Sequence, residues 1–139
     1  MIEVADAESV ILEHARPLPP QAGPPALGRV LAEDVASDID MPPFDKAMMD
    51  GFAVRSADLA TGPRVLEVIE EITAGHTPTK TVSDGQAARI MTGAPLPPGA
   101  DAVVMVERCE VVGETTVSVP GSIETGLNIQ PKARELQSG

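Results

Sequence analysis

The chain has 139 residues, which is enough for one or two small domains but too few for a large multi-domain enzyme. Asp and Glu number 21 against 10 Lys and Arg, and the formal net charge of −11 argues against nucleic-acid or anionic-membrane partners. With one cysteine, no leader pattern at its start and no stretch apolar enough for a membrane span, the chain is expected in the cytoplasm.

The pattern of apolar residues near the start of the chain predicts a short helix. Apolar side chains recur there at three- and four-residue spacing, which is typical of one face of an amphipathic helix. Asp6 precedes them and is a candidate N-cap. We therefore expect a helix over residues 6–15.

Prolines dominate the next segment, residues 17–25, and predict a stiff, extended connector. Pro25 suits the first turn of a second short helix, because its fixed φ is already helical. The apolar face of that helix would be formed by Leu27, Val30 and Leu31. Residues 34–39 are then expected to be extended, so a boundary near residue 40 separates a helical and extended arm from the rest of the chain.

Beyond Pro42, short apolar runs alternate with Gly and Pro, a pattern typical of β structure. The chain has two Phe and no Trp or Tyr, so we expect a core of Val, Ile, Leu, Met and Ala. The expected strands are 52–54, 64–72, 88–91, 102–106 and 117–119. The sequence therefore predicts an α+β fold, in which the arm precedes a compact β-rich domain.

Three details of these strands can be predicted. Residues 102–106 are continuously apolar, which indicates a strand buried on both faces. The acidic residues within 64–72 indicate a half-exposed strand. Residues 110–112 and 116–119 flank Gly113, and we expect a hairpin in which Gly113 takes a positive φ.

The first segment with unusual polar groups is residues 41–55, which contains Asp50 before Gly51. One interpretation is an ordinary turn, in which Asp50 accepts backbone N–H bonds and Gly51 supplies a special φ. The other is a carboxylate on a rigid turn that binds a hydrated Mg²⁺ or a ligand. Met48 and Met49 are expected to fill the core.

The second such segment is residues 89–101, where an apolar strand runs into Thr92 and Gly93. A hydroxyl and neighbouring N–H groups at the end of a strand suit an oxyanion or phosphate. The alternative is a proline-stiffened loop, because the Gly-Lys-Ser/Thr element of a Walker loop is missing. Arg89 is either a solvated strand residue or an anion-binding guanidinium.

The remaining polar residues predict no metal site. Two histidines and Cys109 lack zinc-site spacing, and Cys109 is expected to be a small apolar residue rather than a nucleophile. Four aspartates fit no EF-hand spacing and are expected to form a solvated acidic face: Asp38, Asp40, Asp45 and Asp50.

Ordered blocks along the chain carry a family resemblance. They are 27–35, 42–45 with 49–55, Ala74-Gly75, 89–105 and 126–129, and they include Met49-Asp50-Gly51 and Met91-Thr92-Gly93. In these blocks the sequence resembles the N-terminal part of the molybdopterin molybdotransferases, the molybdenum insertases that include the E domain of gephyrin. Several blocks in the right order are far more specific than one short motif.

The resemblance implies the first two domains of the insertase architecture. Residues 1–40 would belong to the first domain, 41–128 to the β-rich second domain, and 129–139 to the start of a return segment to the first. Family members are dimers whose active site forms between the third, pterin-binding domain of one subunit and the second domain of the other. This chain would therefore supply half of that site in a homodimer and would be inactive alone.

The implied reaction is the insertion of molybdate into adenylylated molybdopterin, with cleavage of the adenylate and help from a divalent cation, Mg²⁺. Asp50 and Thr92 match motif positions that face the cleft, so they are the implied catalytic residues, with Asp50 also the metal-binding one. We expect Thr92, Gly93, Arg89 and Glu135 to bind substrate.

The sequence departs from the family pattern in two places. Lys46 and Ala47 replace two small polar residues, and residues 130–135 replace an Arg-rich run followed by Gly-Glu-Asp, which puts Glu135 where an acidic site residue would fall. Two other hypotheses stay open at this point. One is a stand-alone dimerisation or partner-binding module without catalytic activity, and the other is a β-rich domain that shares only the fold.

Overall fold

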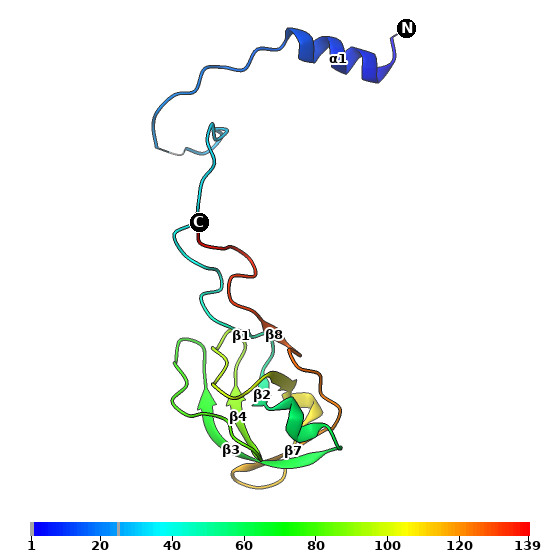
Figure 1. Cartoon of the computed structure of the whole chain (residues 1–139), viewed down its shortest axis with the longest axis vertical. Coiled ribbons are helices and arrows are strands. Elements are labelled where there is room, and N and C mark those ends of the chain that lie inside the picture. Colours follow the sequence, from blue (N-terminus) through cyan, green and yellow to red (C-terminus); the bar gives the residue numbers. More distant parts are fainter. Residues whose placement is uncertain (1, 25) are drawn as a thin grey trace. The chain divides into compact units, whose positions relative to one another are not determined.

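The structure is a computed structural model that describes residues 2–24 and 26–139 (Figure 1). The chain divides into two compact units, Met1–Val35 and Ala36–Gly139. The described residues are mostly sheet with one short α-helix. No helix in them is long and apolar enough to cross a membrane.

The helix of the first unit is α1, Val4–His14, so the predicted N-terminal helix is confirmed but begins two residues earlier. Asp6 is not its N-cap: Glu3 holds that position, without a side-chain capping bond. Asp6 lies instead in the first turn, where a negative charge interacts favourably with the helix dipole. None of the helix side chains is buried.

The second predicted helix is wrong. After Ala26 the chain makes a single turn, in which the Arg29 N–H donates to the Ala26 carbonyl at 3.2 Å and Gly28 has a φ of 82°. Leu27 and Val30 are fully exposed, so no packing supports a helix that is too short to be stable by itself. Pro25, its expected first residue, lies outside the described residues.

A six-stranded sheet forms most of the second unit. Its strand order is β5-β2-β4-β3-β7-β6, antiparallel throughout except for the parallel pair β3 and β4. The strands are β2 Gly51–Val54, β3 Arg64–Ile72, β4 Gln86–Ile90, β5 Ala102–Met105, β6 Glu110–Val111 and β7 Thr116–Val119. Two 3₁₀ turns, η1 Ser56–Leu59 and η2 Val106–Arg108, follow β2 and β5. The predicted strands are confirmed to within two residues at each end.

A separate two-stranded ribbon pairs β1, Lys46–Ala47, with β8, Ile129–Gln130 (Figure 1). The sequence did not predict this ribbon. Beyond it, isolated bridges join Met41 to Leu136 and Ser37 to Ser138. The start and the end of the second unit are therefore fastened to each other.

The two faces of the sheet carry separate apolar clusters, because side chains alternate along each strand. Phe52 and Val104 belong to one cluster, whereas Ala53 and Val103 belong to the other. Strand β2 and residues 102–104 of β5 are thus buried on both faces. The prediction for residues 102–106 is confirmed over 102–104, whereas Met105 and Val106 are partly exposed. Exposed, partly buried and buried residues are mixed along β3, so its half-exposed character is also confirmed.

The methionines do not fill this core as expected. Met48 is 50% exposed and Met49 is 42% exposed, and the buried core is made of Val, Ile, Leu, Ala and one Phe. Both methionines lie in the bends between β1 and β2, where the chain passes from the two-stranded ribbon into the six-stranded sheet.

The hairpin between β6 and β7 is confirmed, with Val111 opposite Val117. Gly113, however, is not among the residues with a positive φ. A Cβ at this position would lie 2.5 Å from the Thr116 hydroxyl oxygen. Lack of space, rather than a left-handed backbone, therefore favours glycine in this turn.

Candidate functional site

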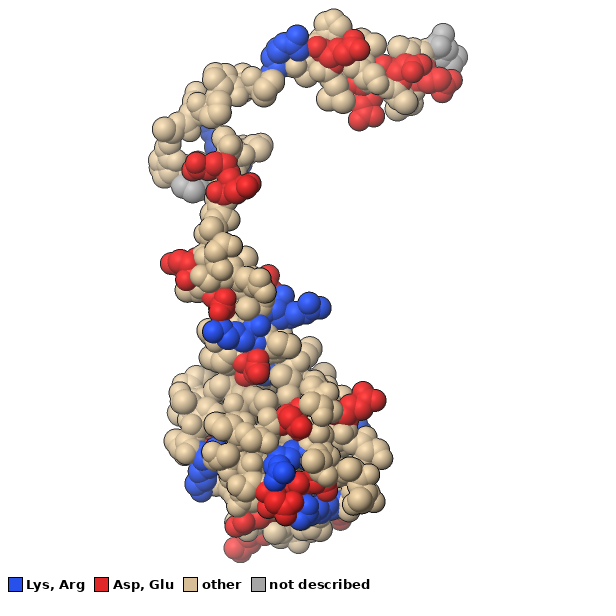
Figure 2. Space-filling view, in the orientation of Figure 1, with Lys and Arg blue, Asp and Glu red and all other residues tan. Residues whose placement is uncertain are grey.

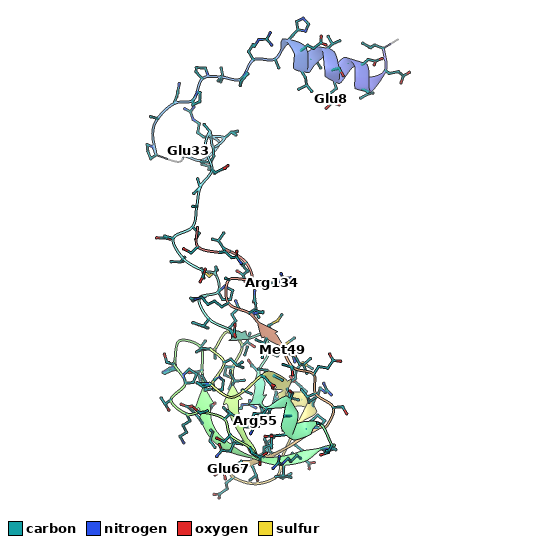
Figure 3. All side chains as sticks on the ribbon, in the orientation of Figure 1. Glu8, Glu33, Met49, Arg55, Glu67 and Arg134 are labelled. Atoms are coloured by element: carbon teal, nitrogen blue, oxygen red, sulfur yellow. The ribbon has the colours of Figure 1, made fainter. Side chains whose placement is uncertain are left out.

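Asp50 and Thr92 lie together at one end of the sheet. Strands β2 and β4 are antiparallel, with Gly51 opposite Ile90, so the residue before β2 meets the residues after β4. Asp50 Oδ1 accepts two hydrogen bonds from Thr92, one from its backbone N–H and one from its hydroxyl, both 2.7 Å long. Both residues are exposed. Figure 3 shows the neighbouring Met49 at the end of the β domain next to the β1–β8 ribbon.

These bonds keep Asp50 ionised. The hydrogen bond from the Thr92 N–H lowers the pKa of Asp50 most, and the bond from the Thr92 hydroxyl lowers it further. Desolvation raises this pKa, and the positive charge of Arg89 lowers it. No residue in the described part of the chain donates a hydrogen bond to the other oxygen, Oδ2. The arrangement therefore offers solvent an oriented, negatively charged oxygen.

Gly51 is required here for a reason that the sequence did not reveal. Its φ is not positive, so the expected special φ is wrong. A Cβ on Gly51 would collide with the carbonyl oxygen of Val104 and lie 2.8 Å from its carbonyl carbon, because β2 and β5 approach closely at this point. The Val106 N–H also donates to the Asp50 carbonyl at 3.0 Å. The backbone of Asp50 is thus fixed by the first residue of η2, directly after β5, and its side chain is fixed by Thr92.

The N–H groups of Thr92 and Gly93 do not point outward as expected. Thr92 donates its N–H to Asp50, and Gly93 donates its N–H to the Ala47 carbonyl at 2.8 Å. The turn that contains them, with a φ of 83° at Gly93, folds back on β1. Thr92 consequently orients the carboxylate. Gly93 leaves open space in front of its backbone, because no atom lies within 4 Å of a Cβ built there.

Arg89 lies opposite Phe52 across β4 and β2, and its guanidinium carbon is 5.1 Å from the centre of the Phe52 ring. This distance is that of a cation–π contact. The contact holds a half-exposed positive charge near Asp50 without forming an ion pair with it.

Glu135 belongs to a second cluster. Its Oε1 accepts a hydrogen bond of 2.6 Å from the Gln130 amide and lies 3.7 Å from the Lys46 ammonium. Among the described residues, no hydrogen bond or ion pair joins this cluster to Asp50 or Thr92. Strand β1 nevertheless lies between the two clusters, since it is hydrogen-bonded to the turn after β4 on one side and to β8 on the other.

Gln130 was not among the expected site residues. Only its pairing with Lys46 across the ribbon places it at the site, and that pairing joins two short segments far apart in the sequence. The one available signal was the departure from the family pattern at both segments.

Two aspartates of the expected acidic face have structural partners instead. Asp45 accepts the Lys132 N–H at 2.7 Å, and Asp40 accepts the Ser138 N–H at 3.0 Å and pairs with the Lys132 ammonium at 3.1 Å. The described part of the chain contains no group of three or more His, Cys, Asp or Glu side chains placed to hold a metal. Burial raises the pKa of Cys109 to about 11, which agrees with its expected role as an unreactive residue.

Comparison with known proteins decides the family. The family model of the MoeA N-terminal region (domain I and II) matches residues 2–139. The chain belongs to this family. The resemblance of the ordered blocks is thereby confirmed, and the hypothesis of a β domain that shares only the fold is wrong.

Relatives of this MoeA N-terminal region are longer proteins. The molybdopterin molybdenumtransferase of Staphylococcus epidermidis is 44% identical over 118 residues, and that of Bacillus subtilis is 42% identical over 121 residues. Each match covers 82% of this chain and 28% of the relative. The chain thus spans less than a third of the curated relatives that it matches.

Solved structures agree. Two crystal structures of the molybdopterin biosynthesis MoeA protein from Pyrococcus horikoshii superpose with TM-scores of 0.73 and 0.77, at 41% and 37% identity. They cover 81% and 82% of this chain, which corresponds to 30% and 31% of theirs. The fold of the MoeA N-terminal region is therefore the fold of this chain.

Proposed function

We propose that this chain acts in molybdenum cofactor biosynthesis as the N-terminal part of a molybdenum insertase. It would help to insert molybdate into adenylylated molybdopterin in the cytoplasm and would supply one half of an active site shared between two subunits of a homodimer. The other half would come from a pterin-binding domain. Family membership and the names of the relatives support the reaction class, and the geometry around Asp50 supports the half-site.

The observation that carries the proposal is the exposed Asp50 carboxylate, oriented by both donors of one threonine. A reaction that joins two anions needs neutralisation of charge and groups that are oriented in advance. Asp50 provides an ionised oxygen at a fixed place, and Thr92 holds it there. Gly93 leaves room for a substrate to approach the backbone, and Arg89 holds a positive charge nearby.

The site around Asp50 can supply one ligand to Mg²⁺. Mg²⁺ usually keeps several waters and binds one or two carboxylates together with substrate phosphates, rather than a complete protein cage. The described residues offer no cage, but Asp50 Oδ2 is a suitable single ligand. Bound there, the cation would supply neutralisation of oxyanion charge. Thr92 would keep Asp50 ionised and in position for it.

The proposal is tested in a chimera, in which this chain replaces the matching segment of the Bacillus subtilis transferase. Molybdenum incorporation into adenylylated molybdopterin is measured with and without Mg²⁺. We expect activity in the unmodified chimera, a loss of about a hundredfold for Asp50→Asn and of about tenfold for Thr92→Val.

Glu70 and Thr79 provide a matched control. The Glu70 carboxylate also accepts a threonine N–H and hydroxyl, at 3.0 and 2.7 Å, and its pKa is also lowered, chiefly by the Thr79 hydroxyl. Glu70→Gln and Thr79→Val should leave the activity of the chimera within twofold. Full activity in the Asp50 and Thr92 variants would instead support a dimerisation or partner-binding module without catalysis.

A further inference from the structure

Basic side chains gather next to the β1–β8 ribbon. Figure 2 shows blue Lys and Arg atoms at the level of this ribbon, in a chain whose formal net charge is −11. Residues 131–137, which follow β8, line a hollow of ≈ 330 Å³ and include Lys132 and Arg134. Lys46 of β1 reaches Glu135 in the same segment.

Lys46 differs from the other two lysines of the chain. The Lys80 ammonium donates to the Ile69 carbonyl at 2.6 Å, and the Lys132 ammonium lies 3.1 Å from Asp40. The Lys46 ammonium is 3.7 Å from Glu135, too far for a hydrogen bond, and finds no other acceptor in the described residues. Its side chain is nevertheless only 29% exposed. The stem is therefore held in place while the N–H donors stay uncommitted.

Glu135 does not depend on Lys46 for a hydrogen bond. The Gln130 amide donates to Oε1 of Glu135 at 2.6 Å. Lys46 and Gln130 are direct partners in the antiparallel ribbon, so their side chains project from the same face. Gln130 thus holds the carboxylate, which leaves the ammonium available to another anion.

Lys46 is also close to Asp50 along the chain. Four trans peptide units join the two residues, so their Cα atoms are at most about 15 Å apart. The Ala47 carbonyl accepts the Gly93 N–H, which ties β1 to the turn that orients Asp50. Lys46 and the Asp50 carboxylate therefore belong to one hydrogen-bonded corner of the β domain.

We propose that Lys46 is an oxyanion-binding residue, which holds a phosphate or molybdate group over the hollow formed by residues 131–137. The identity of the anion rests on the proposed function. The ammonium exchanges a long ion pair with Glu135 for charge-assisted hydrogen bonds to the ligand. The stretches 46–47 and 130–135 meet at this point through the β1–β8 pairing and the contact between Lys46 and Glu135.

The test is binding to the 139-residue chain by calorimetry and by NMR shifts, at constant ionic strength. Two probes separate the sources of the oxyanion, sodium molybdate and adenosine monophosphate. Lys46→Met should lower the affinity for whichever probe binds by about tenfold, whereas Lys80→Met should change that affinity less than twofold. Lys46→Arg should retain most of the affinity. Glu135→Gln should tighten binding about threefold, because a competing carboxylate is removed.

Binding is measured without turnover, so the result does not depend on whether the chimera inserts molybdenum. A response to molybdate alone, or to the nucleotide alone, assigns the site to that group. If neither probe binds at concentrations on the order of 10 mM, where only a non-specific contact would remain, the proposal is wrong. It is also wrong if Lys46→Met binds as tightly as the unmodified chain while its unfolding curve is unchanged.

Discussion

Gly51→Ala tests how the Asp50 backbone is held. The added Cβ would collide with the Val104 carbonyl, so β2 and β5 would have to separate at the Gly51–Met105 pair. Overpacking costs about 1–3 kcal/mol, and each buried backbone hydrogen bond that is lost costs about 1 kcal/mol more. The bond from the Val106 N–H to the Asp50 carbonyl is one of those at risk. We expect a destabilisation of about 3 kcal/mol or more.

Urea unfolding followed by circular dichroism is the assay, because the chain has no Trp or Tyr for fluorescence. With a slope of about 1.5 kcal/mol per M, the midpoint should fall by about 2 M. Gly23→Ala should change stability by less than about 0.5 kcal/mol, since it has open space and no positive φ. Gly93→Ala also has open space, but its φ of 83° should cost about 1 kcal/mol. The reasoning is refuted if Gly51→Ala is as stable as Gly23→Ala, or if Gly93→Ala is the more costly change.

Three further predictions concern single side chains. Thr92→Val should raise the pKa of Asp50 toward its ordinary value, as seen by NMR titration, because one of two hydrogen bonds to the carboxylate is lost. The stability that ionised Asp50 contributes is complete above the ordinary aspartate pKa and is lost as the pH falls through the lowered value. In Thr92→Val this contribution should be smaller, and its loss should be complete at a higher pH. Cys109, with a pKa of about 11, should react with iodoacetamide at pH 8 roughly a hundredfold more slowly than in the urea-unfolded chain, as measured by mass spectrometry. Leu66→Ala, at a fully buried position, should cost about 2–5 kcal/mol in urea unfolding, whereas Val111→Ala, at a position 67% exposed, should cost less than about 0.5 kcal/mol.

The sheet could be predicted from the sequence because its strands are apolar runs bounded by Gly and Pro. Residues 64–72 form a strand with the predicted limits, and residues 102–104 are buried on both faces. The helix expected after Pro25 failed for a physical reason. Helical spacing of Leu27 and Val30 has no effect when nothing covers that face and Gly28 adopts a left-handed backbone.

The candidate site residues in the two polar segments, 41–55 and 89–101, could be picked out from the sequence, but the contacts that these residues make could not be predicted. The pairing of Asp50 with Thr92 follows from the register of β2 and β4, which local patterns do not determine. The same is true of Lys46 and Gln130, whose strands are only two residues long. From the sequence, the Thr92 and Gly93 N–H groups were expected to be free for a ligand. In the structure the turn folds back, and the two groups donate to Asp50 and to the Ala47 carbonyl.

The central claim is that Asp50 of this chain completes an active site on a second subunit. It is tested most directly by mixing the 139-residue chain with the Asp50→Asn chimera and measuring molybdenum incorporation, with mixed dimers counted by native mass spectrometry. We expect the unmodified chain to restore activity at least about tenfold above that of the Asp50→Asn chimera, and the chain carrying Asp50→Asn to restore none. Mixed dimers without restored activity would contradict the claim.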